Sequence, residues 1–250
     1  MRLCYLGSEE RRRYLQNAAS PGVTVERLDD FTPTVGRPEV IESLYDEALL
    51  APWNVEMSIE AERRRFDAVI TGCVGDPGVE AAREMVRIPV IGPGQAALHT
   101  AAMLGYTFSV LSPLDSTVGP TRALVRHHGL EARCASVRSV NCSVTTLRDG
   151  RPETFRAVLD VARRCIDEDG ADTLVLACAS LSHVLGDRLA DALPVPVVNA
   201  LRVSVRMAEL FVGSRLSHSQ VAYPIPPARD AARSTPRTTE RAGGPARSRE

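Results

Sequence analysis

One short pattern occurs twice in the chain, and it constrains the fold more than any other feature of the sequence. In each copy an aspartate opens an apolar, β-branched run that ends six residues later in a cysteine, from Asp67 to Cys73 and from Asp172 to Cys178. A proline lies sixteen residues beyond each cysteine, and a second short apolar run follows it. Because only two copies exist, the pattern predicts a duplicated domain rather than a solenoid.

Apolar runs alternate with helical patterns along most of the chain, which is typical of α/β proteins with parallel sheets and right-handed crossovers. We therefore predict two pseudo-symmetric α/β lobes with the functional site in the cleft between them. The first lobe is predicted to comprise residues 1–92 together with 200–220, and the second residues 93–199. Residues 221–250 are rich in proline and arginine and have little to bury, so this tail is predicted to be disordered.

Two local predictions concern the first lobe. The residues after the first cysteine run predict a helix that Asp76 caps and that has Pro77 at its first position, where a missing N–H costs nothing. Residues 39–65 form a long helical pattern that contains Pro52. Because proline removes a helical hydrogen bond, we expect this helix to break near Pro52.

The composition argues against several classes of function. The chain has 30 basic and 31 acidic residues and a formal net charge of -1, so no overall field attracts nucleic acid or an anionic membrane. No run approaches the ~20 apolar residues of a membrane span. Six cysteines occur without a secretion signal, which predicts reduced thiols and a cytoplasmic protein. Without a Cys-x-x-Cys pair or a histidine pair at helical spacing, we expect no metal site.

Equivalent strand ends of a duplicated domain face one another, so Cys73 and Cys178 are predicted to approach one small molecule from opposite sides. This arrangement suits a reaction in which one cysteine removes a proton from a carbon and the other returns a proton to the opposite face. A thiol titrates near ~8.5, and we expect helix N-termini or nearby cations to lower this pKa toward neutrality, so that one thiolate serves as base while the opposing thiol serves as acid. No cofactor is needed if a carbonyl acidifies the C–H bond. Backbone N–H groups after each cysteine, at Val74, Gly75, Ala179 and Ser180, are placed to stabilise the enolate.

The other four cysteines do not end a strand before a glycine turn. We interpret Cys4, Cys134, Cys142 and Cys165 as ordinary buried residues, because cysteine is among the residue types most often buried. The chemistry is therefore assigned to the two cysteines at repeat positions.

Two stretches around the first cysteine resemble a known family. Residues 72–78, Gly-Cys-Val-Gly-Asp-Pro-Gly, and residues 89–97, Pro-Val-Ile-Gly-Pro-Gly-Gln-Ala-Ala, resemble the hydantoin racemase branch of the aspartate/glutamate racemase superfamily. The resemblance extends more weakly over residues 1–213. It implies two flavodoxin-like lobes and a cofactor-independent isomerase that uses two cysteines on 5-monosubstituted hydantoins or allantoin. It also implies a homo-oligomer.

The resemblance further implies roles for residues of this chain. Cys73 and Cys178 are the two acid–base residues, and the loop at residues 36–41 helps to select the 5-substituent. The substrate ring is held by residues in four turns, which are Gly7, Ser8, Val74, Gly75, Ser112, Ala179 and Ser180. The chain departs from the family in three of these turns, at residues 6–9, 112–113 and 177–180. Each departure changes the hydrogen-bond partners of the ligand and leaves the cysteines in place.

Two other functions remain open at this point. The same cysteine pair would serve an amino-acid racemase of the aspartate or glutamate type, or a maleate-isomerase-like enzyme. A free carboxylate would need several hydroxyl or amide donors after the first strand, where only Ser8 is present beside Glu9 and Glu10. Alternatively, a non-catalytic two-lobed sensor would bind a small molecule between the same cysteines. Exchange of a ligand proton with solvent separates an enzyme from a sensor.

Overall fold

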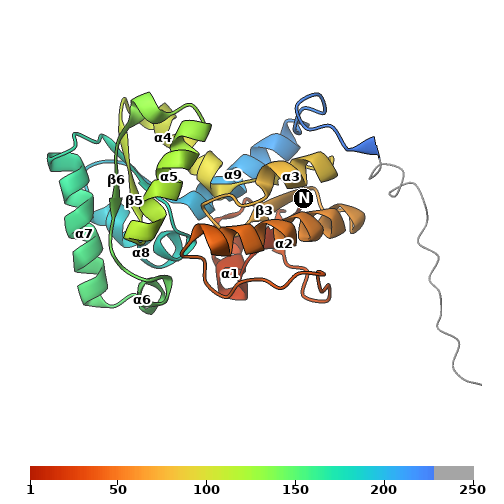
Figure 1. The fold of residues 1–250 in the computed structure, drawn as a ribbon, viewed down its shortest axis with the longest axis horizontal. Coiled ribbons are helices and arrows are strands. Elements are labelled where there is room, and N and C mark those ends of the chain that lie inside the picture. Colours follow the sequence, from red (N-terminus) through yellow and green to blue (C-terminus); the bar gives the residue numbers. More distant parts are fainter. Residues whose placement is uncertain (228–250) are drawn as a thin grey trace, which may run out of the picture.

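Two four-stranded parallel sheets form the centre of the computed structural model, which describes residues 1–227 (Figure 1). The first sheet has the strand order β2-β1-β3-β4 and the second has β6-β5-β7-β8, so one topology is built twice. Parallel sheets of this order with helices on both faces are flavodoxin-like. The predicted α/β class and the duplication are confirmed.

The strands and helices alternate in chain order. The first half contains β1 (Arg2–Leu6), α1 (Glu9–Ala18), β2 (Thr24–Glu26), α2 (Leu44–Arg63), β3 (Ala68–Thr71), α3 (Val79–Met85), β4 (Val90–Ile91) and α4 (Pro93–Leu104). The second half contains β5 (Phe108–Ser112), α5 (Asp115–His127), the short 3-10 helix η1 (Glu131–Arg133), β6 (Cys134–Ser139), α6 (Val144–Asp149), α7 (Pro152–Asp167), β7 (Thr173–Leu176), α8 (Ala179–Ala192), β8 (Val197–Val198) and α9 (Ala200–Gly213). Helix α6 is an element that the sequence pattern did not predict.

The repeated aspartates have the same structural role in both sheets. A carboxylate oxygen of Asp67 accepts a hydrogen bond from the N–H of Arg2 at 2.6 Å, and one of Asp172 accepts from the N–H of Thr107 at 3.1 Å. In both copies the two partners are 65 residues apart. Each aspartate therefore ties the start of one strand to the start of its neighbour, which accounts for its place in the repeat.

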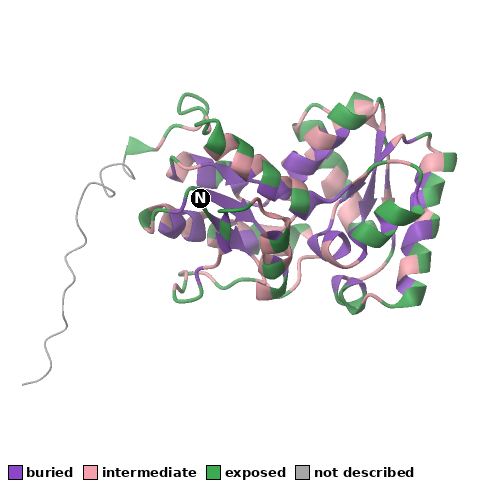
Figure 2. Ribbon diagram, turned by 180° about the vertical axis from the view of Figure 1, so that it is seen from behind, coloured by how far each residue is buried: buried purple, intermediate pink, exposed green. Residues whose placement is uncertain are grey.

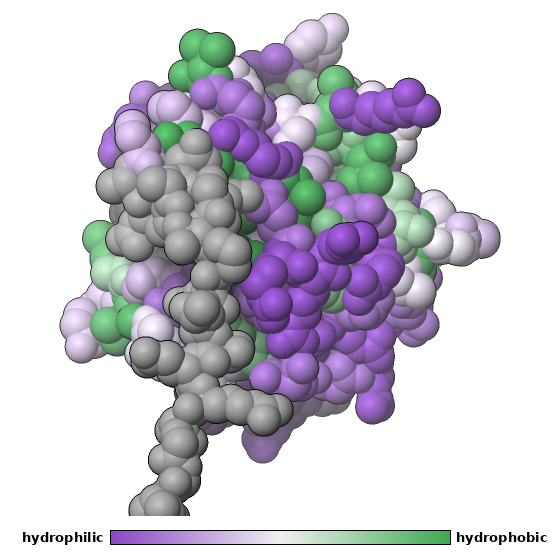
Figure 3. All heavy atoms as spheres, turned by 90° about the vertical axis from the view of Figure 1, so that its right-hand side faces the viewer, coloured by the Kyte–Doolittle hydropathy of each residue, from purple (hydrophilic) through white to green (hydrophobic). Residues whose placement is uncertain are grey.

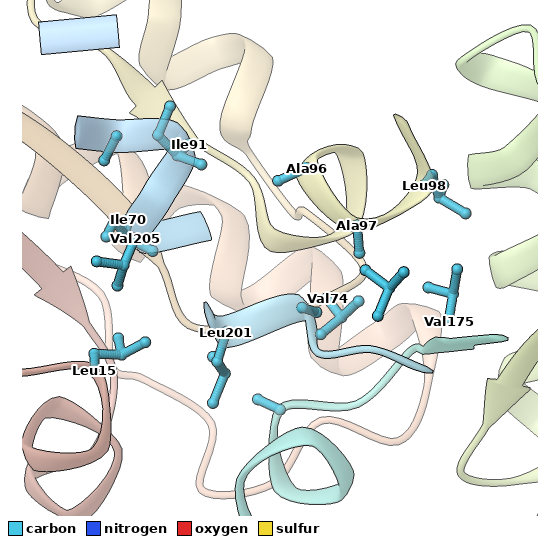
Figure 4. Packing of buried hydrophobic residues seen from close by; sticks show 14 of the residues in the cluster. Leu15, Ile70, Val74, Ile91, Ala96, Ala97, Leu98, Val175, Leu201 and Val205 are labelled. Atoms are coloured by element: carbon cyan, nitrogen blue, oxygen red, sulfur yellow. The ribbon is translucent and has the colours of Figure 1, made fainter. Parts of the chain in front are cut away.

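Helices α4 and α9 join the two lobes. Helix α4, from the first half of the chain, packs on β7 and β8 of the second sheet, whereas α9, from the second half, packs on β3 and β4 of the first. The two helices also contact each other, and their apolar residues share one core cluster with strands of both sheets (Figure 4). Ala97 of α4 and Leu201 of α9 are fully buried there. The walls of the cleft thus rest on a common core.

Each lobe also has an apolar cluster of its own, under α2 and α3 in the first and under α7 and α8 in the second. Buried residues follow the strands and the inner faces of these helices (Figure 2), as expected for parallel sheets covered on both faces. The outer end of the first lobe is largely hydrophilic with scattered apolar side chains (Figure 3). Within the described residues, no helix is long and apolar enough to cross a membrane. Most of the predicted disordered tail, residues 228–250, lies outside the described part.

The long helix α2 is continuous, so the predicted break near Pro52 is wrong. Pro52 still removes one helical hydrogen bond. Packing offsets this loss, because Leu50 is buried and the side-chain amide of Asn54 donates to the carbonyl of Pro77 at 2.8 Å. The helix also begins later than the pattern indicated, after Ser43, whose side chain caps it.

Asp76 caps a different helix from the one predicted. Helix α3 begins at Val79 with Gly78 as its N-cap, and Asp76 lies before it in the left-handed conformation, with φ of 55°. The Asp76 carboxylate instead accepts hydrogen bonds from the N–H groups of Gly94 at 2.9 Å and Gln95 at 2.6 Å, in the first turn of α4. The prediction for α3 is wrong because two donors from a distant segment fix this carboxylate.

Candidate active site

Both repeat cysteines line one cavity of about 80 Å³, which lies where the carboxyl ends of the two sheets meet. Cys73 comes two residues after the end of β3, and Cys178 two residues after the end of β7. The first turns of α2 and α8, the first three turns of α5, helix α6, one residue of α1 and the loop before α2 complete the walls. The structure therefore brings the two cysteines to one site from equivalent positions of the two sheets.

Six of the nine predicted site residues line this cavity. They are Cys73, Val74, Gly75, Cys178, Ala179 and Ser180. All six belong to the turns that follow β3 and β7, the two strands at which the repeat was recognised.

The other three predicted residues, Gly7, Ser8 and Ser112, are not among the lining residues. Ser8 is the N-cap of α1, and Gly7 lies so close to the ring of Tyr5 that a Cβ there would overlap it. The hydroxyl of Ser112 is buried and pairs with that of Thr117 at 2.7 Å. Thr117 itself lines the cavity, so Ser112 supports a residue of the cavity wall. A direct role of these three in substrate binding stays a prediction.

Cys178 is the N-cap of α8. Its backbone is extended, with φ of -148° and ψ of 133°, and the helix begins at Ala179. The N–H of Ser182 closes the first turn on the Cys178 carbonyl at 2.9 Å. Because the first N–H groups of a helix have no partner within it, those of Ala179 and Ser180 remain at the cavity wall. Such a helix terminus stabilises negative charge that develops nearby.

Cys73 lies in a turn, and the helix that follows it begins only at Val79. Burial raises the pKa of the Cys73 thiol to about 12. The charges of Glu47 and Asp76 raise it too, while the N–H of Gly75 acts in the opposite direction. The predicted lowering of this pKa toward neutrality is wrong, because burial of the sulfur, and after it the nearby carboxylates, favour the neutral thiol. The charge of Cys178 also raises this pKa, so the two sulfurs interact electrostatically.

The carboxyl groups beside Cys73 are themselves perturbed. Burial raises the pKa of Asp76 to about 7, although the N–H groups of Gln95 and Gly94 favour its charged form. Burial also raises the pKa of Glu47, and the charge of Asp46 adds to this effect. In residues 1–227, no group of three or more His, Cys, Asp or Glu side chains is arranged to hold a metal ion.

Sequence reasoning did not single out the arginines of the cavity. The arginines that line the cavity are Arg11, Arg37 and Arg148. Arg11 is only 7% exposed, and its guanidinium donates to the Ser180 hydroxyl at 2.7 Å. It is the first of three consecutive arginines on α1, a run typical of a solvated face. Its spacing from Leu15, the other buried residue of that helix, is the signal that could have marked it.

The sequence of the chain matches a known family of proteins. The model of the Asp/Glu/hydantoin racemase family matches residues 14–208. The chain belongs to this family. It is 36% identical to a hydantoin racemase of Rhizobium meliloti over 190 residues, 75% of this chain and 78% of that protein. It is 34% identical to a hydantoin racemase of Paenarthrobacter aurescens over 198 residues, 79% of this chain and 82% of that one.

Solved structures agree with this assignment. An allantoin racemase from Klebsiella pneumoniae has a TM-score of 0.81 at 29% identity, over 90% of this chain and 94% of that chain. A glutamate racemase from Francisella tularensis, at 13% identity and a TM-score of 0.59, shares the fold alone. The family resemblance inferred from the sequence is confirmed, and the homologues identify this chain as a racemase, an isomerase.

Proposed function

We propose that this racemase interconverts the enantiomers of 5-monosubstituted hydantoins or of allantoin, with Cys73 and Cys178 as its acid–base pair and without a cofactor. The observation that carries the proposal is that both cysteines line one cavity from equivalent strand ends of the two sheets. Homologous hydantoin and allantoin racemases support the substrate class.

Proton transfer starts from a protonated Cys73, because its pKa of about 12 keeps it a thiol at neutral pH. The Cys178 thiolate takes the proton from C5 on one face, and the C–H electron pair moves into the adjacent carbonyl to give an enolate. The Cys73 thiol then donates its proton to the other face of C5. The cycle ends with a Cys178 thiol and a Cys73 thiolate, which is the starting state for the opposite enantiomer.

The enolate needs stabilisation beyond the acid–base pair. The N–H groups of Ala179 and Ser180, at the start of α8, supply donors toward the ring carbonyl oxygen. A preorganised donor of this kind is typically worth ~10²–10³ in rate. Positioned acid–base groups contribute a further ~10²–10⁴.

Deuterium exchange with polarimetry tests the proposal. In deuterated buffer, the wild-type enzyme is expected to abolish the optical rotation of allantoin or of a chiral 5-alkylhydantoin while deuterium enters at C5. Cys73→Ser and Cys178→Ser should each lose racemisation by ~10²–10⁴. Cys134→Ser is the matched control, because Cys134 opens β6 and does not line the cavity.

Two results would count against the proposal. If either cavity variant keeps wild-type racemisation, the two-cysteine mechanism is wrong. If aspartate or glutamate is racemised faster than every hydantoin, the substrate is a free amino acid instead.

A further inference from the structure

The three cavity arginines lack ion-pair partners among residues 1–227. The arginines next to Arg11 on α1 do have such partners. Arg12 and Arg13, which follow Arg11 along α1, pair with Glu9 at 2.8 Å and 3.0 Å. Arg11 turns away from this pair into the cavity. On α1, the neighbouring arginines are therefore neutralised by Glu9, whereas Arg11 has no counter-ion among the described residues.

Arg11 is the most constrained of the three. It is buried, and its guanidinium donates to a neutral partner, the Ser180 hydroxyl. A guanidinium has five donors, and buried charges in proteins are normally paired. A buried cation without a carboxylate partner is energetically unfavourable. A ligand that brings a negative charge would remove this penalty.

Arg37 and Arg148 extend the cationic wall toward solvent. Both are exposed. Arg37 comes from the loop after β2 and lies 5.5 Å from the centre of the Trp53 ring, while Arg148 comes from α6 and reaches the Glu39 carbonyl at 3.5 Å. Desolvation lowers the pKa of Arg37, and the charges of Arg11 and Arg148 lower it further. Arg11 and Arg148 thus both act electrostatically on Arg37, although the three arginines come from separate segments.

The acids of the cavity do not cancel this charge. Glu39 and Glu47 also line it, but no ion pair joins either of them to an arginine in the described part of the chain. Burial raises the pKa of the Glu47 carboxyl. Glu47 also lies against Gly75, on the Cys73 side of the site. The arginine side of the cavity is therefore electropositive.

We propose that the preferred substrate of this enzyme is a hydantoin whose 5-substituent ends in a carboxylate, bound by Arg11, Arg37 and Arg148 while the ring lies between the two cysteines. This inference rests on the proposed hydantoin racemase activity and adds the charge of the substituent to it. Guanidinium groups match a planar carboxylate with paired hydrogen bonds. An amide of the same shape has only one acceptor oxygen, and its NH₂ group would face the N–H donors of the arginines. We therefore expect the site to bind the carboxylate much more tightly than the amide.

A matched pair of substrates tests the inference. We expect kcat/KM for 5-(2-carboxyethyl)hydantoin to exceed that for the isosteric 5-(2-carbamoylethyl)hydantoin by at least ~10-fold, which corresponds to about 1.4 kcal/mol. Arg37→Gln should reduce this ratio to below ~3-fold. Arg13→Gln, an exposed arginine of α1 that is already paired, should leave the ratio unchanged. Raising the ionic strength should lower the ratio for the wild type, because the interaction is electrostatic.

The outcomes separate this inference from the activity on which it rests. If the wild type racemises the amide as fast as the acid, the carboxylate site is wrong and the racemase proposal stands. If neither hydantoin is racemised, the proposed activity fails, and titration calorimetry then decides the inference by itself. Tighter binding of the acid that Arg37→Gln abolishes would support a carboxylate site, whereas equal binding of acid and amide would overturn it.

Discussion

The two cysteines occupy equivalent positions in two sheets of identical topology, yet their surroundings differ. Cys178 is the N-cap of α8, so free backbone N–H groups adjoin it. Cys73 is separated from α3 by a turn, and carboxyl groups of Glu47 and Asp76 lie near it. Duplication therefore preserved the position of the sulfur and changed its electrostatic environment. Two cysteines at symmetric positions thus form a chemically asymmetric pair, in which Cys73 is protonated at neutral pH.

The source of the difference is a capping residue. In the second half, Asn199 caps α9 directly and accepts from the N–H of Arg202 at 3.2 Å. In the first half the equivalent position is Gly92, which has no side chain to cap α4. Asp76 takes over this role from the turn after Cys73. A carboxyl group is thereby fixed beside one cysteine and not beside the other.

The strongest test of the comparison uses each enantiomer separately. Cys73→Ser should retain C5 exchange for one enantiomer, and Cys178→Ser should retain slower exchange, because Cys73 is protonated at neutral pH; the retained enantiomer should be opposite in the two variants. The reason is that the remaining cysteine reaches only one face of the ring. Exchange of the other enantiomer should fall by ~10²–10⁴, as followed by loss of the C5–H signal in deuterated buffer. Retention of the same enantiomer by both variants would show that the cysteines do not face opposite sides.

The next test removes the helix N–H that adjoins Cys178. Ala179→Pro deletes this donor at the first helical position, which tolerates proline, and the extended backbone of Cys178 suits a following proline. We expect kcat/KM to fall by ~10²-fold, with little change in the unfolding temperature. Unchanged activity in a folded variant would remove the α8 terminus from the mechanism.

The third test, Glu47→Gln, removes one of the two carboxyl groups that lie near Cys73. Because the Glu47 charge raises the pKa of Cys73, its removal should lower that pKa. A fall of about one unit would speed alkylation of Cys73 by iodoacetamide near pH 9 about 10-fold, as measured by peptide mass spectrometry. Glu39→Gln, at the other cavity glutamate, is the matched control. Equal alkylation rates in the wild type and Glu47→Gln would mean that burial alone sets the pKa of Cys73.

The smallest expected effect is a pH dependence of the free energy of unfolding, caused by Asp76. The folded-state pKa of Asp76, about 7, lies above its ordinary value of 3.8, so between these values the folded protein keeps a proton that the unfolded chain releases. The free energy of unfolding contributed by this group is therefore present below about pH 4 and lost as the pH rises through 7. Relative to Asp76→Asn, which cannot titrate, the wild type should lose at least about 1.4 kcal/mol over this range in denaturant titrations. A difference that is constant with pH would show an unshifted Asp76.

Local sequence signals predicted elements well where neighbours in the chain decide the structure. The repeat predicted both sheets and the positions of both cysteines, and the apolar runs predicted the buried strands. The predictions failed where distant segments intervene. Pro52 does not break α2 because α3 packs against that helix, and Asp76 does not cap α3 because α4 takes its carboxylate. Arg11 was missed because three successive arginines are typical of a solvated face, and only its spacing from Leu15 indicates that it turns inward.

The sequence by itself determined that the chain is a duplicated α/β protein with a cysteine at the end of one strand in each half, because periodicity and spacing are properties of neighbouring residues. Only the tertiary structure decided which charges surround each cysteine. Glu47, Asp76 and the three arginines come from separate segments, and their effect depends on burial and on distance through space. Those are set when the two lobes close around one cavity.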